Sequence, residues 1–460
     1  MSSKTKSTST KEGSKPALVP KLRFPEFRGD EGWASEPMGE IYLFKGNNSL
    51  SRDKLNYLAG SVKNIHYGDI HTKFATHFDI TNELVPFINE AELDAIRDED
   101  LCAEGDMIFA DASEDLDDIG KSIEIVSLNG ESVVSGLHTI LARQTGNRIV
   151  KGFGGHLFKS VWVRSQIQRE AQGAKVLGIS SNRLRNIRLP LPYDKAEQRK
   201  IAACLSSVDE AIAAQARKVD ALRTYKKGLM QQLFPRPERI ENGVKVPAET
   251  QPRLRFPEFR KAERWVATIL GKLSEVVRGG SPRPIDSFLT TAADGLNWLK
   301  IGDVDKEAKY VTRTTEKVRR EALSKTRVVN PGDLILSNSM SFGRPYVLQI
   351  RTCIHDGWIA ITEIDKRADQ DFLYYLISAP SSQSYFVDNA AGSGVQNLNA
   401  DIIKALPISI PLPAEQLRIA SCLSTLDDLI TAETRKLDTL KTHKKGLMQQ
   451  LFPQVGGADA

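Results

Sequence analysis

The sequence predicts an α+β protein in which two mixed α/β domains are separated by two long antiparallel coiled-coil helices with internal pseudo-twofold symmetry. Three observations support this fold class: a ten-residue segment that occurs twice, a second repeated segment that opens each half, and two long stretches with helical apolar spacing. At 460 residues the chain also exceeds the size at which a single hydrophobic core normally stops growing.

The ten-residue segment KKGLMQQLFP occupies Lys226 to Pro235 and occurs again at Lys444 to Pro453. The two copies begin at residues 226 and 444, so the repeat period is 218 residues. Since solenoid and propeller repeats have periods of roughly 20 to 50 residues, this period indicates duplication of a domain-sized unit. LRFPEFRGDEGW (22–33) likewise returns as LRFPEFRKAERW (254–265). Between these markers the halves share only short fragments such as EGDMIFA and PGDLILS. The duplicated frame has been kept while its contents have diverged.

The composition is that of a globular, water-soluble protein, with 40% hydrophobic and 26% charged residues. No apolar run approaches the ~18 residues of a membrane helix, and the first residues lack the apolar core of a signal peptide. A cytoplasmic location is therefore expected. Neither a zinc site nor a disulfide framework is indicated, because no C-x-x-C pair occurs among Cys102, Cys204, Cys353 and Cys422.

The formal net charge of +5 permits nucleic-acid binding without requiring it. The second half contains the basic run KVRREALSKTR (317–327), whereas residues 90–118 of the first half are mainly acidic. Charge alone therefore does not establish a function.

Two stretches that follow LPLP (189–192) and IPLP (410–413) lack proline and internal glycine as far as Gly228 and Gly446, which predicts two helices. Their apolar residues alternate in steps of four and three, the spacing of a coiled-coil seam. The seam of the first helix contains Ile201, Leu205, Val208, Ile212, Gln215, Val219 and Leu222, and that of the second contains Ile419, Leu423, Leu426, Ile430, Glu433, Leu437 and Leu440.

Polar seam residues favour antiparallel helices, because a parallel pair would place Lys226 against Lys444 without a counter-charge. In an antiparallel pair Gln215 can meet Glu433, and each lysine lies near one end, where its ammonium group can extend to water. A helix of about 37 residues (197–233) would span about 55 Å, or roughly 16 base pairs of B-DNA. The pair would then act as a ruler between two DNA-binding domains. The alternative is a plain interaction helix in a scaffold protein.

Both halves carry the combination E-Q-x-x-I-A, at Glu197 and Glu415, followed by K-K-G-L-M-Q-Q-L-F. These segments resemble the conserved regions of specificity subunits of type I restriction-modification systems. The RFPEF openings, the G-D fragments and AGSGVQNLNADIIKALPI (391–408) are similar to that family as well. The resemblance covers residues 20–453.

The resemblance implies a DNA-binding subunit that performs no catalysis. In that family each of two target-recognition domains binds one half of a bipartite, asymmetric DNA sequence, while the helical spacer fixes the gap. The frame binds two methyltransferase subunits and two restriction subunits, so S-adenosylmethionine, ATP and Mg²⁺ are expected on the partners and no cofactor on this chain. The alternatives are a coiled-coil scaffold without sequence-selective DNA binding and a self-sufficient DNA methyltransferase.

Seven segments are expected in order along the chain. They are a disordered tail (1–20), target-recognition domain 1 (21–192), spacer helix 1 (193–235), a linker (236–252), target-recognition domain 2 (253–411), spacer helix 2 (412–453) and a tail (454–460). The first copy has three extra residues at Tyr193 to Lys195, which leaves the equivalence of the two helix starts open.

The candidate DNA contacts are basic, amide and hydroxyl side chains on exposed loops. In the second domain the loops are RGGSPRP (278–284) and NSMSFGR (338–344), and in the first they are KGNNSLSR (45–52) and GKS (120–122). The predicted residues are Lys45, Asn47, Asn48, Arg52, Lys121, Arg278, Ser281, Arg283, Asn338 and Arg344.

Motifs for chemistry are weak or missing. KGFGGH (151–156) is predicted to be a turn rather than an S-adenosylmethionine loop, since no convincing strand precedes it. No Walker motif occurs, so ATP binding is not expected. DASEDLDD (111–118) is predicted to be a solvated acidic loop rather than a Mg²⁺ site, and His66, His71 and His77 lack the spacing of metal ligands. No catalytic or metal-binding residue is predicted.

Two repeated features each have two interpretations. A glycine costs a helix interior roughly 1 kcal/mol relative to alanine, so Gly228 and Gly446 indicate either a close backbone approach or a helix break. Phe24 and its counterpart Phe256 either pack on the helical frame or belong to a partner-docking surface.

Overall fold

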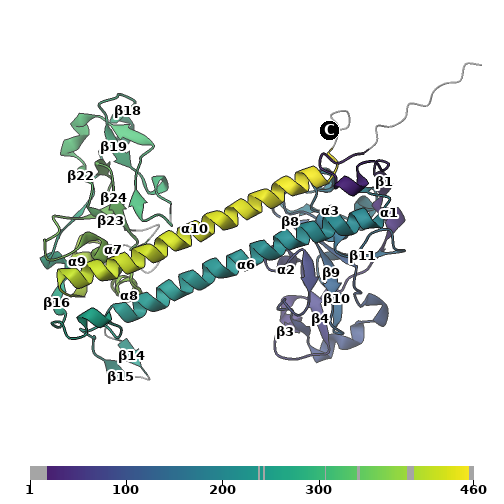
Figure 1. Ribbon diagram of the computed structural model, residues 1–460, viewed down its shortest axis with the longest axis horizontal. Coiled ribbons are helices and arrows are strands. Elements are labelled where there is room, and N and C mark those ends of the chain that lie inside the picture. Colours follow the sequence, from purple (N-terminus) through teal and green to yellow (C-terminus); the bar gives the residue numbers. More distant parts are fainter. Residues whose placement is uncertain are drawn as a thin grey trace, which may run out of the picture. The chain divides into compact units, whose positions relative to one another are not determined.

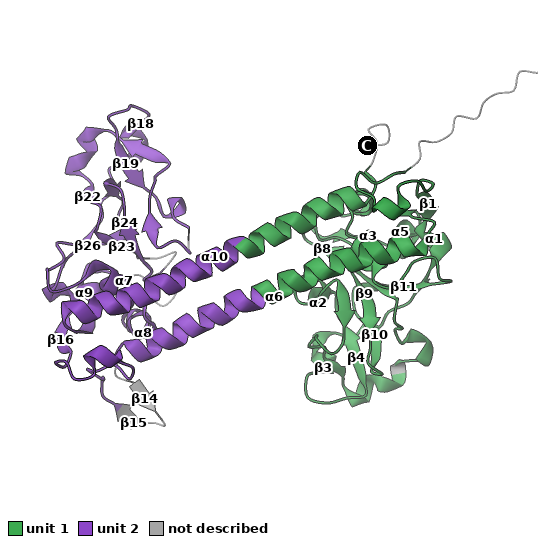
Figure 2. Cartoon of the chain, in the orientation of Figure 1, with its two compact units in different colours: residues 1–215, 436–460 green, residues 216–435 purple. Residues whose placement is uncertain are grey.

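The computed structural model describes residues 18–236, 239–241, 244–305, 307–338, 342–390 and 398–454. The chain divides into two compact units, which we call the first unit (residues 1–215 with 436–460) and the second unit (residues 216–435) (Figure 2). Each unit contains one α/β region and part of each long helix. Residues 1–17 of the predicted N-terminal tail and residues 455–460 of the predicted C-terminal tail lie outside the described residues.

The two long helices are α6 (Lys195–Leu233) and α10 (Pro413–Leu451), with 39 residues each (Figure 1). The repeated glutamates Glu197 and Glu415 are the third residue of their helices, so the helix starts are equivalent despite the three extra residues in the first copy. Both helices continue through Gly228 and Gly446, so a helix break at these glycines is wrong. No helix in the described part of the chain combines the length and apolar character needed to cross a membrane.

Contacts within the second unit show that α6 and α10 run antiparallel. In the second unit Lys218 Nζ lies 2.5 Å from Glu433 Oε1, and Lys226 Nζ lies 2.5 Å from Asp427 Oδ1. From the first pair to the second, the residue number rises along α6 and falls along α10. The predicted contact between Gln215 and Glu433 stays a prediction, because these residues belong to different units.

The expectation that the repeated lysines extend to water is wrong. Lys226 pairs with Asp427 in the second unit, and Lys444 Nζ lies 2.5 Å from Asp209 Oδ1 in the first. The lysine side chains are 20% and 18% exposed. A partly buried ammonium group is stabilised more by a nearby carboxylate than by incomplete hydration, which explains the difference.

The predicted seam lies on the less exposed side of each helix. The buried seam residues are Ile201, Leu205, Gln215, Val219, Ile419, Leu423 and Leu437. The half-buried seam residues are Val208, Ile212, Leu222, Leu426, Ile430, Glu433 and Leu440.

The central sheet has the same topology in both units. Its strand order is β2-β11-β7-β9-β5 in the first unit and β17-β26-β23-β24-β20 in the second. All neighbours are antiparallel except the last pair, β5 with β9 and β20 with β24, which is parallel. The strands are Tyr42–Lys45, Thr139–Gln144, Met107–Ala110, Ser122–Ser127 and His77–Asp79 in the first unit, and Glu275–Arg278, Trp358–Thr362, Leu334–Ser337, Pro345–Leu348 and Tyr310–Val311 in the second.

A second sheet accompanies each central sheet. Its strand order is β10-β4-β6-β3 in the first unit and β18-β21-β19-β25-β22 in the second. Each of these sheets contains one parallel pair, β4 with β10 in the first unit and β19 with β25 in the second. The strands are Ser132–Ser135, Val62–Ile65, Phe87–Ile88 and Leu55–Asn56, then Leu289–Thr290, Glu316–Val318, Leu296–Leu299, Thr352–Ile354 and Arg327–Val329. Two mixed sheet-and-helix units with long helices confirm the predicted fold class.

Short strand pairs and helices complete the units. The pairs are β1 (Ala34–Pro37) with β13 (Arg188–Leu191), β16 (Val266–Ile269) with β27 (Pro407–Ile410), β8 (Ala112–Ser113) with β12 (Leu177–Gly178), and β14 (Arg239–Glu241) with β15 (Val244–Val246) inside the predicted linker. The shorter helices are α1 (Met38–Ile41), α2 (Tyr67–Thr72), α3 (Phe153–Leu157), α4 (Val161–Glu170), α5 (Ser181–Leu184), α7 (Gln370–Ser378), α8 (Pro380–Asn389) and α9 (Ala400–Lys404).

The shared G-D fragments form the turn that leads into β7 and β23. Gly105 and Gly332 have φ angles of 90° and 97°, which side-chain-bearing residues rarely adopt. The next residue closes the turn, because Ala103 N donates to Asp106 Oδ2 and Asn330 N donates to Asp333 Oδ2, each at 2.7 Å. The fragments therefore specify how the central strand begins.

Candidate nucleic-acid interface

In the second unit, four of the predicted DNA-contacting residues meet at Asp356. This residue lies between β25 and β26. Arg278 Nε and Asn338 Nδ2 donate to its carbonyl oxygen at 2.8 and 3.1 Å. Ser281 Oγ donates to Oδ1 at 2.7 Å, and Arg283 Nη2 lies 3.4 Å from Oδ2. Three separate chain segments therefore form one loop edge, which we call the Asp356 edge.

Two glycines allow the loop after β17 to approach the turn before β26. A Cβ on Gly279 would lie 2.1 Å from the carbonyl oxygen of His355, and one on Gly280 would lie 2.7 Å from that of Lys325. Both distances are too short for any side chain, so the glycines hold Ser281 against Asp356. His355 supports the turn, because its Nδ1 accepts from Gly357 N at 2.8 Å.

The Asp356 edge exposes charged groups of both signs. The side chain of Arg283 is 81% exposed and that of Asp356 is 41% exposed, whereas Asn338 is buried. The hydrogen bond from Ser281 lowers the pKa of Asp356, and the nearby His355, Arg278 and Arg283 lower it further. The carboxyl group of Asp356 is thus ionised at neutral pH.

Arg344 does not join the Asp356 edge. Its Nη1 lies 3.6 Å from Glu307 Oε1, and its guanidinium group lies over the ring of Tyr346. The structure therefore separates Arg344 from the other four predicted residues of this unit.

In the first unit, the predicted amides hold the corresponding loop in place. Asn47 Nδ2 donates to the carbonyl oxygens of Gly136 and Thr139 at 3.1 and 2.7 Å. Asn48 Nδ2 donates to Asn64 Oδ1 at 2.7 Å and to the carbonyl oxygen of Ser135 at 3.0 Å. These amide nitrogens bind the turn between β10 and β11, which corresponds to the turn that contains Asp356.

Lys45 and Arg52 also have partners within the first unit. Lys45 Nζ donates to the carbonyl oxygen of Glu99 at 2.7 Å. Arg52 Nη2 donates at 3.0 Å to Asp69 Oδ1, and the Asp69 side chain is fully buried. Arg52 is therefore part of a structural ion pair as well as a partly exposed cation.

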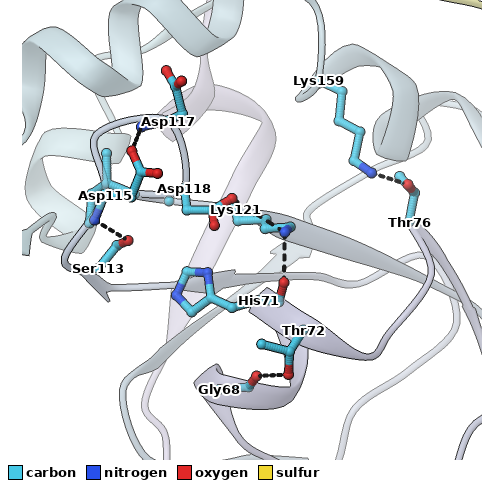
Figure 3. Close-up of polar contacts among 12 residues, drawn as sticks. Gly68, His71, Thr72, Thr76, Ser113, Asp115, Asp117, Asp118, Lys121 and Lys159 are labelled. Carbon is cyan, nitrogen blue, oxygen red and sulfur yellow. Dashed lines mark hydrogen bonds and ion pairs between the residues drawn. The ribbon is translucent and has the colours of Figure 1, made fainter. Parts of the chain in front are cut away.

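Lys121 lies beside the acidic loop that the sequence singled out (Figure 3). Its Nζ donates to the carbonyl oxygen of His71 at 2.8 Å and lies 3.3 Å from Asp118 Oδ1. In the same loop Ser113 Oγ accepts from Asp115 N. Among the described residues, no group of three or more His, Cys, Asp or Glu side chains is placed to hold a metal ion.

Asp111 and His138 were not predicted as DNA contacts, and Asp111 was assigned only to the acidic loop. Both residues nevertheless occupy positions that match those of the Asp356 edge. Asp111 follows β7, and its backbone N–H donates to the carbonyl oxygen of His138 at 3.1 Å. In the second unit Asn338 follows β23, and its backbone N–H donates to the carbonyl oxygen of Gly357, also at 3.1 Å. His138 Nδ1 lies 3.1 Å from Asp111 Oδ1. The sequence contained one signal for this match, because Asp111 and Asn338 each directly follow a shared G-D fragment. We call this set the Asp111 edge.

The repeated opening and the repeated helix start are joined by a buried glutamate, and we call this contact the joint. In the first unit Arg23 donates to Glu197 through Nε and Nη2, both at 2.8 Å, and Trp33 Nε1 donates to it at 3.3 Å. The same bonds link Arg255 and Trp265 to Glu415, at 2.7, 2.7 and 3.3 Å.

The glutamine of the repeated E-Q pair binds main chain in both units. Gln198 accepts from Val150 N at 2.8 Å and donates to the carbonyl oxygen of Arg148 at 3.0 Å. Gln416 accepts from Asp369 N and donates to the carbonyl oxygen of Arg367, both at 2.7 Å. The repeated motif thus fixes each α/β region to its helix.

The aromatic residues of the openings pack on the helical frame. Lys200 lies over the ring of Phe24 at 5.6 Å, and Arg418 lies over the ring of Phe256 at 4.4 Å. Both rings are partly buried against the cores of their units.

The glycine-rich segment KGFGGH begins the short helix α3 rather than forming a turn alone. Its amides are already bonded, because Gly152 N and Gly155 N donate to the two carboxylate oxygens of Glu124 at 2.6 Å. Burial raises the pKa of Glu124 to about 7. A protein carboxylate therefore occupies the amide groups that an anionic cofactor would need.

Comparisons with known proteins agree with this organisation. Residues 264–442 match the family model described as type I restriction modification DNA specificity domain. The putative type I restriction enzyme MjaX specificity subunit of Methanocaldococcus jannaschii is 24% identical over 363 residues, which cover 76% of this chain and 77% of the relative. The MjaVIII specificity subunit of the same organism is 23% identical over 330 residues, covering 68% and 72%.

Solved structures share the fold. The type I restriction-modification S subunit from M. genitalium superposes with a TM-score of 0.54 at 13% identity, over 95% of this chain and all of the other. A chain from a structure of type I R-M complex assembly and conformational transition gives 0.55 at 16% identity, over 92% and 98%. Residues 264–442 thus match a type I specificity domain, and the chain as a whole is similar in sequence to specificity subunits of type I restriction-modification systems and shares the fold of solved S subunits.

Proposed function

We propose that each unit binds one half of a bipartite, asymmetric DNA sequence through its loop edge, and that the long helices set the unspecified gap. The observation that carries this proposal is a contrast within the molecule. The joints repeat the same bonds in both units, while matching loop positions carry different side chains: Arg278, Ser281 and Arg283 in one unit, Asn47 and Asn48 in the other. Such a protein can attach both recognition surfaces to the helices in the same way and still distinguish two different half-sites.

The side chains at the edges suit this role. Arginine donates to guanine, amides pair with adenine, and acidic groups accept from cytosine, while lysine and arginine bind phosphates. The chain itself transfers no methyl group and cuts no DNA. S-adenosylmethionine, ATP and Mg²⁺ bind instead to partner subunits, two methyltransferase and two restriction subunits per complex. The comparisons give no support to the scaffold alternative.

Genome-wide methylation mapping tests the proposal. Cells that carry this chain with its methyltransferase partner are compared with cells that lack the chain. We expect a split methylation motif that disappears with the chain, and unchanged methylation would contradict the proposal. Exchanging residues 266–395 for the same region of a relative should change one half of the motif, and adding one heptad to both helices should widen the gap.

The frame provides two matching surfaces for identical partners. Among the ten residues of the repeated segment, the buried ones are explained by core packing, because Leu233, Phe234, Leu451 and Phe452 belong to the cores of their units. Identity at exposed positions has no such explanation. The exposed or half-buried identical pairs include Lys227 and Lys445, Gly228 and Gly446, Gln231 and Gln449, and Gln232 and Gln450.

The glycines support docking at these surfaces. An added Cβ on Gly228 or Gly446 would meet nothing within 4 Å, so no close approach within the described part of the chain requires them. A glycine that costs roughly 1 kcal/mol in a helix is explained if a partner backbone packs there. We therefore place one methyltransferase subunit at each glycine.

Substitution of the glycines tests the two docking sites. Gly228→Leu or Gly446→Leu alone should reduce the bound methyltransferase subunits from two to one, as measured by native mass spectrometry, and the double variant should bind none. The control is Ala221→Leu, which changes an exposed α6 residue whose counterpart in the second copy is Thr439. Two bound subunits in the double variant would contradict this placement.

A further inference from the structure

Asp356 is a carboxylate that is held in place but not buried. Ser281 Oγ donates to Oδ1 at 2.7 Å and accepts from Asp356 N at 3.2 Å, so two bonds fix the orientation of the side chain. The side chain nevertheless remains 41% exposed. Asp69 in the first unit shows the contrast, because its fully buried carboxylate binds Arg52 and Lys73 at 3.0 and 2.8 Å.

Arg283 faces the free side of this carboxylate. Its Nη2 lies 3.4 Å from Asp356 Oδ2, and its side chain is 81% exposed. Such an exposed pair contributes little to stability. The two groups therefore present a donor fork and an acceptor side by side at the surface of the Asp356 edge.

Basic groups adjoin the pair. Arg278 donates to the carbonyl oxygen of Asp356, and Lys325 and Arg327 lie on the segment that packs against Gly280 and pairs with β25. All three side chains are exposed. These cations suit phosphate binding, whereas a carboxylate repels phosphates. A fixed, exposed carboxylate at this place is better explained by contact with a base than with the backbone.

The chemistry of the pair matches one kind of base pair. In the major groove guanine presents two acceptors, O6 and N7, which arginine binds, and cytosine presents the N4 amine, which an acidic side chain accepts from. Because Arg283 and Asp356 are in contact, they can bind both members of the same pair. If adenine replaced guanine, its N6 amine would face the donor Arg283 and thymine O4 would face the acceptor Asp356, so both contacts would be mismatched. In the reversed pair, thymine would offer Arg283 one acceptor, O4, in place of the two acceptors of guanine.

We propose that Arg283 and Asp356 together select one G·C base pair in the half-site bound by the second unit, with Arg283 donating to guanine and Asp356 accepting from cytosine N4–H. Ser281 is the positioning residue that orients the carboxylate. This inference rests on the proposed function, since it assumes that the Asp356 edge contacts DNA. It adds the identity of a base pair and the residues that select it.

The test uses the full chain in its complex with the methyltransferase partner. Methylation motifs are mapped for the wild type, Asp356→Asn, Arg283→Gln and Ser281→Ala. Binding is then measured on duplexes in which each G·C pair of the relevant half-site is replaced by A·T. Asp365→Asn is the matched control, because this carboxylate of the same unit also pairs with an arginine, Arg367 at 2.9 Å, and is 34% exposed.

We expect Asp356→Asn and Arg283→Gln to relax the same G·C position, with a loss of discrimination of roughly tenfold to a hundredfold. Ser281→Ala should relax that position less, and Asp365→Asn should leave the motif unchanged. Thermal melting should show that all four variants fold like the wild type.

Three outcomes would overturn the inference while leaving the proposed function intact. They are a second half-site without any G·C pair, an unchanged motif in both Asp356→Asn and Arg283→Gln, or relaxation of two different positions by these variants. A wild-type chain that produces no split motif at all would instead contradict the proposed function. The two failures are thereby distinguished.

Discussion

The joints and the loop edges differ in how much freedom their chemistry leaves. Each joint binds an arginine and a tryptophan to one buried glutamate, with bond lengths that agree within 0.1 Å between Arg23–Glu197 and Arg255–Glu415. A buried charge must be paired by groups of fixed geometry, so the sequence there has not diverged. Of the five residues that meet at the Asp356 edge, Asn338 alone is buried, so the other side chains can change without leaving an unpaired buried group. The same fold thus contains a constrained frame and a variable surface.

The largest effect is expected when a joint loses its carboxylate. Glu197→Ala would leave the buried Arg23 without the carboxylate that it pairs with, and Glu415→Ala would remove the partner of Arg255, whose side chain is 14% exposed. Removing one partner of a buried ion pair costs about 3–5 kcal/mol. Thermal and urea unfolding of each variant measures the loss, and the two variants should be destabilised alike.

The comparison with an exposed pair provides the control for this prediction. Arg367→Ala removes a side chain that is 64% exposed from its pairing with Asp365, so it should change stability by less than about 1 kcal/mol. Equal losses in Arg367→Ala and Glu415→Ala would show that burial does not explain the repeated motif.

The second effect depends on pH and concerns the first unit. His156 is fully buried, and burial lowers its pKa to about 2. A depressed folded-state pKa contributes stability that is present above the unfolded value near 6.5 and is lost as pH falls. Unfolding measured from pH 7 to pH 4.5 should show a loss of about 1.4 kcal/mol per pH unit below 6.5 that is missing in His156→Asn.

Neighbouring groups make the difference between variants the informative quantity. Burial also lowers the pKa of His77, which lies beside His156, while the raised pKa of Glu124 contributes stability that is lost as pH rises through about 7. His138→Asn is the control, because the His138 side chain is 51% exposed. A parallel pH dependence in wild type and His156→Asn would contradict the assignment to His156.

The repeats and the heptad spacing were enough to predict the fold class, because both depend on local sequence. Antiparallel helices followed from the two seam lysines, although their actual partners, Asp209 and Asp427, were missed. Those aspartates lie outside the apolar seam pattern, and a periodicity argument does not find an ion pair between two helices. The role of Glu197 was equally hidden, since its partner Arg23 is far away in the sequence.

The candidate site was predicted in part. Loop composition identified Arg278, Ser281 and Arg283, and the structure brings them together. Asp356 was missed because its importance comes from three chain segments that only the sheet topology brings to one place. In the first unit Asn47 and Asn48 were selected for hydrogen-bonding capacity, which they use on the main chain of their own unit.

The third effect sharpens the comparison between the two seam ion pairs. Asp427 accepts from Lys226 and also from the hydroxyl group of Tyr375 at 2.8 Å. Asp209 accepts from Lys444 in the matching position. Asp427→Asn should therefore cost about 1 kcal/mol more than Asp209→Asn, as measured by urea unfolding. In a Tyr375→Phe background the difference should disappear, and a difference that persisted would show that the hydroxyl group is not its cause.

The smallest effect concerns the glycines of the repeated segment, which belong to the frame but behave unlike its other residues. Because an added Cβ meets no described atom within 4 Å, Gly228→Ala and Gly446→Ala should each stabilise the isolated chain by about 0.5–1 kcal/mol through helix propensity. The same changes should weaken binding of the proposed methyltransferase partner, measured by titration calorimetry. Greater stability with unchanged partner affinity would mean that the glycines serve neither the fold nor the proposed docking surface. Greater stability with weaker binding is expected if the duplicated frame has kept them for the partner.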